Sequence, residues 1–265
     1  MRDDTIRIGV IGAGINTTLM HIPGFQAIDG VEVVAVANRS RESGQRVADE
    51  FGIPTVHDTW ADVIDDPTVN AICIGTWPYM HRTIVLGALD ADKHVITEAR
   101  MAMDAAEAHE MLDAAMEKPH LVAQVVPADF TFRVDQTIMD LISDGFLGEV
   151  LVADLAVNGG FIDRDAPYTW RNDRDMSGYN VMLMGAIFEC FMRWLGPPTS
   201  VTAQTRIHVP RRVVAAGRRK VTTIPDHVDI LCEMASGPVA HLRFTEVVGL
   251  MPAAQAMLFG SEGTL

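Results

Sequence analysis

Short apolar runs alternate with amphipathic stretches through the first half of the chain. Five runs rich in Val and Ile, each bounded by turn residues, occupy residues 6–12, 31–38, 70–75, 93–98 and 121–126. Continuous apolar runs of this length are typical of strands that are buried on both faces of a parallel sheet. Because helical patterns lie between the runs, residues 1–126 are predicted to form an α/β domain with a doubly wound parallel sheet.

Two of the predicted helices carry signals at their ends. Ser40 stands before the helical stretch 40–52 as an N-cap, and Gly52 stands at its C-terminal end. Asp104 is predicted to cap the next such helix, with Glu107 reaching back to it in a capping box.

The pattern changes after Val126. Helical segments at 131–148 and 180–196 flank a predicted strand at 148–159. Three runs of alternating apolar and polar residues, without helices between them, then occupy 200–209, 227–236 and 238–247. Such runs favour an antiparallel sheet with one face to bury. We therefore predict a second domain, residues 127–265, of α+β type on an open, mainly antiparallel sheet.

Composition narrows the class of protein. Of the 265 residues, 48% are hydrophobic, which is enough for a sizeable core. The chain has no apolar run of membrane-spanning length and no signal-peptide pattern at its start, so a soluble cytoplasmic protein is expected. The formal charge of −14 repels phosphate groups, so neither a nucleic acid nor a membrane surface is expected as a partner. The basic run 206–220 is interpreted as a solvated loop or hairpin, with a patch that binds anions as the alternative.

Cysteine usage points away from disulfides and metals. Cys73, Cys190 and Cys232 lie far apart within apolar segments. This spacing favours reduced, buried thiols over a disulfide framework or a zinc site, and no metal site is predicted.

The first predicted strand leads into the sequence GAGINT, residues 12–17, and then into a predicted helix. Gly12 and Gly14 match the first two glycines of a G-x-G-x-x-G loop, which allow a tight turn and a close approach to pyrophosphate. Thr17 replaces the third glycine. The position of the loop favours nucleotide binding over a purely structural turn, with Gly12, Gly14, Asn16 and Thr17 as candidate contacts.

The second predicted strand ends at Asn38, Arg39 and Ser40, where an NAD-binding loop usually has an acidic residue for the ribose hydroxyls. An amide, a guanidinium and a hydroxyl can instead bind a 2′-phosphate. NADP is therefore predicted over NAD, with NAD as the alternative. The other interpretation is that Arg39 is an ordinary exposed residue of a first helical turn.

At this point the sequence resembles the glucose-fructose oxidoreductase, inositol dehydrogenase and MocA family over essentially the whole chain. The matching segments are GAGINT, the 76–81 turn, DKHVITEARMAMDAAEAHEML, FLGEV and LFGSEGTL. The resemblance implies an N-terminal Rossmann domain and a C-terminal domain whose open sheet often mediates oligomerisation. Relatives usually continue beyond the position of Leu265, so the second domain is expected to be abbreviated or the sequence truncated.

The family motif Glu-Lys-Pro, whose lysine is catalytic, corresponds here to Glu98, Ala99 and Arg100. A second family signature ends in an aspartate and a histidine, which correspond to Leu183 and Ile187. All three usual proton-handling positions are therefore apolar, and the standard alcohol oxidation lacks its base.

Three residues remain as candidate catalytic groups: Arg100, Tyr179 and His81. Arg100 stays protonated, so it can clamp an anionic or carbonyl oxygen but cannot act as an acid; its alternative role is to pair with a carboxylate such as Glu98. Tyr179 can donate a proton to a developing alkoxide, or it is a packing residue with a bonded hydroxyl. His81 titrates near neutrality as a residue type, but a histidine at a helix start is more often structural.

The nicotinamide side of the cofactor site is expected near the family turn and the end of the predicted strand 93–98. Its candidate residues are Thr76, Trp77, His81 and Glu98. Trp77 is alternatively a core residue. On the signature helix, Glu189 is interpreted as paired with Arg193 rather than facing the site.

Three functions remain open. The first is an NAD(P)-dependent oxidoreductase acting on a small carbonyl or hydroxyl substrate with relocated proton donors, and it is favoured because the nucleotide loop is largely intact. The second is a lyase or hydrolase on the same scaffold, and the third is a non-catalytic binding protein. A homodimer or homotetramer is expected, because the hydrophobic outer face of an open sheet needs cover.

Overall fold

The structure is a computed structural model that describes residues 5–127, 133–179, 181, 184–214 and 217–265. Leu183, which stands at the family aspartate, lies outside the described residues. The chain divides into two compact units, residues 1–126 and 127–265. Each unit has its own core and is described by itself.

The N-terminal unit is built on a six-stranded sheet in which all neighbouring strands are parallel. Its strands are β1 (Ile6–Ile11), β2 (Val31–Ala37), β3 (Thr55–Val56), β4 (Ala71–Ile74), β5 (His94–Thr97) and β6 (Ala123–Val125). The order β3-β2-β1-β4-β5-β6 confirms the predicted doubly wound sheet. Because the order reverses between β1 and β4, the ligand crevice of such a fold opens at the carboxyl ends of these strands.

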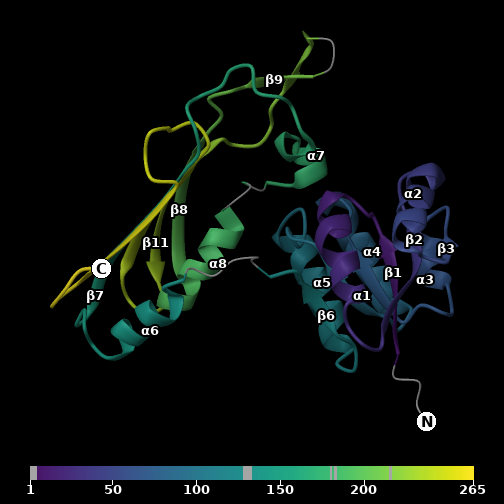
Figure 1. The fold of residues 1–265 in the computed structure, drawn as a ribbon. Coiled ribbons are helices and arrows are strands. Elements are labelled where there is room, and N and C mark those ends of the chain that lie inside the picture. The colour runs from purple at the N-terminus through teal and green to yellow at the C-terminus, as the bar shows by residue number, and fades with distance from the viewer. Residues whose placement is uncertain (1–4, 128–132, 180, 182–183, 215–216) are drawn as a thin grey trace. The chain divides into compact units, whose positions relative to one another are not determined.

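Helices cover both faces of this sheet (Figure 1). They are η1 (Thr17–His21), α1 (Ile22–Gln26), α2 (Arg41–Phe51), α3 (Trp60–Asp65), η2 (Pro78–Met80), α4 (His81–Asp90) and α5 (Ala105–Glu117). One core packs Ile22 of α1 and Val47 of α2 against the sheet, and the other packs residues of α3, α4 and α5. Burial on both faces explains why the strands are continuous apolar runs.

The predicted helix ends are confirmed in one case and shifted in the other. The Ser40 hydroxyl accepts a hydrogen bond from the Ser43 amide at the start of α2, and Gly52 ends α2 in the left-handed conformation. Asp104 caps α5 through the Glu107 amide. The Glu107 carboxylate, however, accepts from the amide of Met103 and not of Asp104, so the predicted capping box is wrong by one residue.

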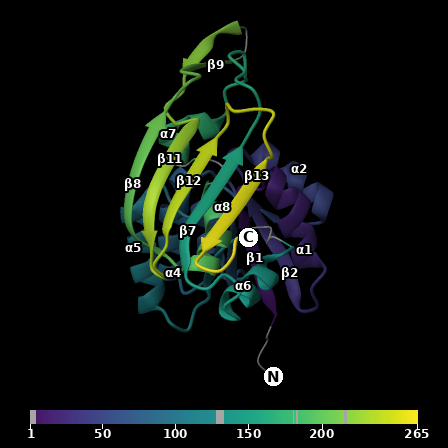
Figure 2. The same ribbon diagram turned by 90° about the vertical axis from the view of Figure 1, so that its left-hand side faces the viewer.

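The C-terminal unit is built on a five-stranded sheet, which confirms the predicted open, mainly antiparallel sheet (Figure 2). Its strands are β7 (Val150–Asn158), β8 (Pro198–Arg206), β11 (His227–Met234), β12 (Val239–Thr245) and β13 (Ala254–Gly260). The order is β13-β7-β12-β11-β8, and only β7 and β12 pair in parallel. In this order β7 lies between β12 and β13, although both of those strands are far from β7 in sequence.

Two helices, α6 (Asp135–Ser143) and α8 (Met184–Leu195), bury one face of this sheet. Phe191 of α8 packs into a core with Leu242 and Phe244 of β12. Asp135 links the helices, since its carboxylate accepts hydrogen bonds from Arg193 at 3.1 Å and from the Trp194 indole at 2.9 Å. The predicted pair of Glu189 with Arg193 is confirmed, at 3.2 Å.

The opposite face of the sheet is bare of helices in the described residues (Figures 1 and 2). Apolar side chains on this face are partly exposed: Val152 at 41%, Val239 at 42% and Leu231 at 53%. Register places Val152 beside Val239, and Leu231 lies one strand further on. This surface, Val152, Leu231 and Val239 with their polar neighbours, is called the outer face below.

The remaining elements of the unit are short. They are η3 (Trp170–Asn172), α7 (Arg174–Ser177), β9 (Arg211–Val213) and β10 (Arg219–Val221). β9 and β10 pair as a hairpin, so the basic run belongs to a hairpin, as one of its two interpretations predicted. The three cysteines are buried and free, as predicted. Among the described residues, no helix has the length and apolar character to cross a membrane.

Candidate functional site

The glycine loop follows β1 at the carboxyl edge of the parallel sheet. Gly12 has φ of +85°, and a Cβ on it would stand 2.7 Å from the backbone nitrogen of Thr76, so no other residue fits. The loop is anchored on its other side, because the Gly12 amide donates to the Ala37 carbonyl at 2.9 Å. Gly14 borders open space, since a Cβ there would come no closer than 3.9 Å to the Gly75 oxygen.

Thr17, which replaces the third glycine of the motif, is accommodated by a glycine on the facing loop. Its side chain is 1% exposed, and a Cβ on Gly75 would stand 2.0 Å from the Thr17 hydroxyl. Thr17 therefore fills the volume that Gly75 leaves. Because its hydroxyl is turned to the Gly12 carbonyl at 3.4 Å, Thr17 supports the loop from inside, and only its backbone is placed to meet a cofactor.

The residues after β2 differ in the contacts that they make. The Asn38 side-chain oxygen accepts from the Ala13 amide at 2.7 Å, which fixes the glycine loop and leaves the Asn38 NH2 group as a donor. Ser40 caps α2. Arg39 is exposed and makes no hydrogen bond or ion pair with the described residues, whereas the neighbouring Arg41 is paired with Asp58 at 2.8 Å.

The turn after β4 is locked by His81. The ring is fully buried, with Nδ1 at 2.8 Å from the Arg100 carbonyl oxygen and Nε2 at 3.0 Å from the Thr76 carbonyl oxygen. Burial lowers the pKa of His81 despite these two acceptors. A neutral ring with no exposed nitrogen cannot exchange protons with a substrate, so His81 ties the two loops together and we do not retain it as a catalytic group.

Thr76 and Trp77 line the same turn. The Thr76 hydroxyl is buried and makes no hydrogen bond in the described part of the chain, while its backbone closes over Gly12. Trp77 is half-buried, and Tyr79 is 43% exposed. This turn thus contacts the glycine loop mainly through its backbone.

Glu98, at the end of β5, is the centre of a polar cluster that joins it to the first helix. One of its oxygens, Oε1, accepts from the side-chain amide of Asn16 and lies 2.5 Å from Nε2 of His21. Burial raises the pKa of Glu98, but the hydrogen bonds from His21 and Asn16 outweigh it and the pKa is lowered. Glu98 and Asn16 are predicted from the sequence because each belongs to a motif, whereas His21 belongs to neither motif and is not predicted.

Ala99 is exposed and Arg100 is partly buried at the start of the loop after β5. The Arg100 carbonyl accepts from His81, so the backbone of Arg100 is fixed against η2 and α4. Ile187, at the family histidine, is 6% exposed within the core of the C-terminal unit. An isoleucine in this core offers nothing to a reacting group.

Tyr179 lies on the surface of the C-terminal unit, where it is 61% exposed. Its hydroxyl accepts from Arg174 at 3.1 Å, and the Arg174 guanidinium also stacks over the ring at 4.2 Å. The hydroxyl hydrogen is still available to a second acceptor. The Tyr179 hydroxyl is thus hydrogen-bonded, as the alternative interpretation predicted, and it can still donate its own hydrogen.

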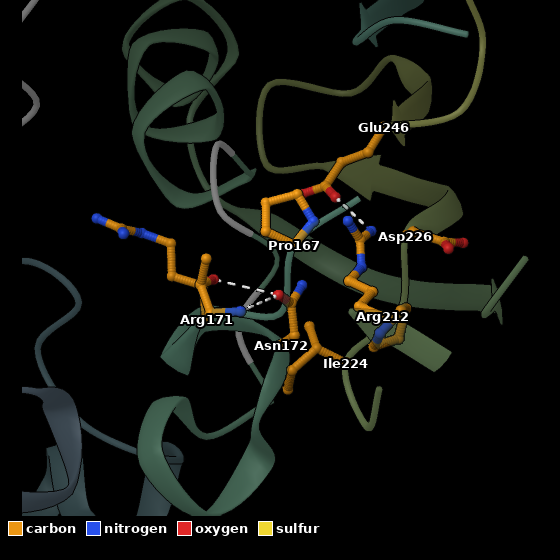
Figure 3. A pocket seen from close by; sticks show the side chains of 9 residues that line it. Pro167, Arg171, Asn172, Arg212, Ile224, Asp226 and Glu246 are labelled. Atoms are coloured by element: carbon orange, nitrogen blue, oxygen red, sulfur yellow. Dashed lines mark hydrogen bonds and ion pairs between the residues drawn. The ribbon is translucent and has the colours of Figure 1, made fainter. Parts of the chain in front are cut away.

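A cavity of about 260 Å³ lies within the C-terminal unit (Figure 3). Arg212 projects into it and is 3.4 Å from Glu246, with its buried Nε unpartnered in the described residues. The Asp226 carboxylate is held by the backbone amides of His208 and Val209, each at 2.8 Å. The Arg171 guanidinium points away from these groups (Figure 3). Within the cavity Arg212 therefore pairs with Glu246, while Asp226 is satisfied by backbone amides.

Comparison with known proteins gives a match along nearly the whole chain. Residues 6–125 match the model of an oxidoreductase family with an NAD-binding Rossmann fold. Residues 136–265 match the model of the GFO/IDH/MocA C-terminal domain.

Individual relatives are distant. An uncharacterized oxidoreductase of Synechocystis is 24% identical across 100% of this chain and 72% of the relative. A trans-1,2-dihydrobenzene-1,2-diol dehydrogenase of Mus musculus is 26% identical across 97% of this chain and 73% of the relative. Among solved structures, a levoglucosan dehydrogenase in complex with NADH and L-sorbose superposes with a TM-score of 0.81 at 22% identity, covering 98% of this chain and 72% of the neighbour.

Proposed function

The chain belongs to the GFO/IDH/MocA oxidoreductase family, and we propose that it is an NAD(P)-dependent oxidoreductase of a small molecule with a carbonyl or hydroxyl group. The observation that carries the proposal is the glycine loop. Gly12 permits no side chain, Gly14 borders open space, and the loop ends at the start of a helix whose first amides have no partners within the helix. These features fit the pyrophosphate of a dinucleotide.

The cofactor is proposed to be NADP, with NAD as the alternative. Support comes from Arg39, which is exposed and unpaired among the described residues, and from the Asn38 NH2 group beside it. The end of β2 offers donors and no carboxylate, which suits a 2′-phosphate better than two ribose hydroxyls. The bound nicotinamide would supply or accept the hydride.

The substrate is proposed to contact Arg100 and Tyr179. Arg100 follows β5 at the edge that carries the glycine loop, where a guanidinium can hold an anionic or carbonyl oxygen. Tyr179 would give its hydroxyl proton to the substrate oxygen during reduction. Ala99 contributes space and no chemistry.

Absorbance at 340 nm tests the proposal directly. Purified protein is mixed with NADPH or NADH and a panel of small ketones, aldehydes and sugars, and the reverse reaction is run with the matching alcohols. Turnover that is faster with NADPH is expected. Cofactor binding without turnover of any panel member would instead favour a non-redox or binding role, which Ala99 and Ile187 at the usual proton-handling positions make the second candidate.

A homodimer or homotetramer is proposed to form through the outer face of the C-terminal sheet. Val152, Leu231 and Val239 expose 41–53% of their surface there, and no helix of the described residues covers them. A second copy of this sheet is the cover that such a surface needs. Multi-angle light scattering at micromolar concentration should give at least twice the 28.9 kDa mass of the chain.

A further inference from the structure

The cluster of Asn16, His21 and Glu98 has the geometry of a carboxylate–histidine dyad. His21 Nε2 lies 2.5 Å from Glu98 Oε1, and both side chains are mostly buried, at 14% and 15% exposure. Asn16 donates to the same oxygen. A partly buried pair held by a third group keeps a fixed orientation, unlike a surface ion pair.

The bonding pattern fixes the tautomer of His21. Glu98 has a lowered pKa, so its carboxylate is ionised at neutral pH and only accepts hydrogen bonds. The hydrogen of a neutral His21 ring must therefore be on Nε2, which leaves a lone pair on Nδ1. His21 Nδ1 makes no hydrogen bond with the described residues and is not among the buried unpartnered atoms, so it is open to a ligand.

A local irregularity of the first helix places the ring. Residues Thr17–His21 form a π-turn, η1, and the ring of His21 stacks near Phe25 with centroids 6.2 Å apart. An α-helix turns by about 100° per residue, so the extra residue of a π-turn rotates the side chains that follow it. π-turns occur often at functional sites, because they aim a side chain that a regular helix would direct elsewhere.

The other titratable groups around Glu98 are less suited to proton exchange than His21. Burial raises the pKa of the Cys73 thiol to about 12, and the nearby Glu98 charge adds to this effect. His81 also feels Glu98, yet burial lowers its pKa and both its nitrogens face carbonyl oxygens. His21 is not enclosed in this way, because its Nδ1 makes no hydrogen bond with the described residues.

We propose that His21, held by Glu98, is the proton-handling group of this site. The idea rests on the proposed oxidoreductase function and supplies the base that Ala99 and Ile187 do not. During oxidation the substrate hydroxyl gives its proton to His21 Nδ1, its carbon gives a hydride to the oxidised nicotinamide, and the C–O bond becomes a carbonyl. The imidazolium that forms is stabilised by the Glu98 carboxylate. In reduction the same proton returns from His21 to the substrate oxygen as the hydride is delivered, so His21 takes over the donor role proposed above for Tyr179, and Tyr179 is left to bind the substrate oxygen.

Kinetics with His21→Gln and a matched control test the assignment. His57 forms a similar pair with Asp66, with Nε2 at 2.9 Å from Oδ2, so His57→Gln makes the same chemical change elsewhere in the unit. His21→Gln should lower kcat for oxidation by about a hundredfold or more and remove the acidic limb of its pH profile. Cofactor affinity, measured by fluorescence titration, should change little in either variant, and His57→Gln should keep both the rate and the limb.

Glu98→Gln supplies a second, independent variant. Without the carboxylate the imidazolium is less stable, so the acidic limb should move to lower pH while His21 remains able to act. An unchanged limb in Glu98→Gln, or a retained limb in a folded His21→Gln protein, overturns the proposal.

NMR separates this inference from the proposed function. In ¹⁵N-labelled protein the imidazole nitrogens of His21 should show hydrogen on Nε2 at high pH, and addition of NADP should perturb Nδ1 more than the nitrogens of His57. If no substrate is turned over but this signature is present, the proposed function fails while the dyad stands. If turnover occurs and His21 carries its hydrogen on Nδ1, the dyad fails while the oxidoreductase stands.

Discussion

Arg39 and Arg41 stand two positions apart but differ in their partners, which makes them a matched pair. Arg41 is bonded to Asp58, whereas Arg39 has no partner among the described residues. Arg39→Ala should weaken NADP binding by about tenfold to a hundredfold, as expected for one charge-assisted hydrogen bond, and leave NAD binding unchanged. Arg41→Ala is the control. Calorimetric titration of both cofactors checks this, and equal losses for NADP and NAD would contradict a 2′-phosphate contact.

Arg100 is expected to act on the substrate and not on the cofactor. Loss of a positioned donor to a developing negative charge costs about a hundredfold to a thousandfold in rate, so Arg100→Ala should reduce kcat by that factor with little change in cofactor affinity. Arg82, which is paired with Glu110 on the surface, provides the control as Arg82→Ala. Full activity of Arg100→Ala in stopped-flow assays would show that the guanidinium is structural.

Asp66 gives a test of stability against pH. Burial raises the pKa of its carboxyl, but hydrogen bonds from Thr68 and His57 outweigh it and hold the pKa at about 2, below the ordinary 3.8. The folded pKa is depressed, so the stabilisation is complete above pH 3.8 and is lost as the pH falls through 2. Asp66→Asn should therefore cost roughly 2 kcal/mol at pH 7 and much less near pH 2. Urea unfolding at both pH values measures the difference.

At the scale of elements, the loops after β1 and β4 fit each other closely. A Cβ on Gly75 would stand 2.0 Å from the Thr17 hydroxyl and 2.4 Å from the Gly12 carbonyl. Gly75→Ala should therefore lower stability by about 1–3 kcal/mol and weaken cofactor binding. Adding Thr17→Gly should recover only part of the loss, because the carbonyl clash stays. Gly24→Ala in α1, where a Cβ meets nothing within 4 Å, is the control, and thermal unfolding with NADP titration reads both effects.

Local patterns were sufficient to predict most strands, though not the two-residue strand β3, and also the cap at Ser40 and the glycine loop, because each depends on neighbours within a few residues. They were not sufficient for η1, because the pattern of residues 17–21 does not distinguish a π-turn from a regular helical turn. The contact of His21 with Glu98 joins residues 77 apart and follows only once β1 and β5 are placed in one sheet. The buried setting of His81 was likewise invisible, because its two carbonyl partners come from different loops.

At the scale of the whole molecule, the outer face should decide the assembly state. Leu231→Glu places a charge on β11 within the outer face and should dissociate the oligomer while leaving the monomer folded, because Leu231 lies outside the core. Glu233→Gln on the same strand changes charge without adding bulk and serves as the control. Light scattering and circular dichroism together read mass and fold. A monomeric wild-type protein would contradict the proposed assembly.

The fit of the Thr17 side chain against Gly75 also has a consequence for sequence searches that identify nucleotide-binding loops. A search that scores the third position of the glycine motif alone penalises threonine. Here, however, a glycine on the facing turn, 58 positions further along the chain, leaves the space that the side chain of Thr17 occupies. Scoring the two positions jointly, by their summed side-chain volume, would identify this loop as intact. It would also offer protein engineers a paired substitution for placing a β-branched residue at the start of a nucleotide-binding helix.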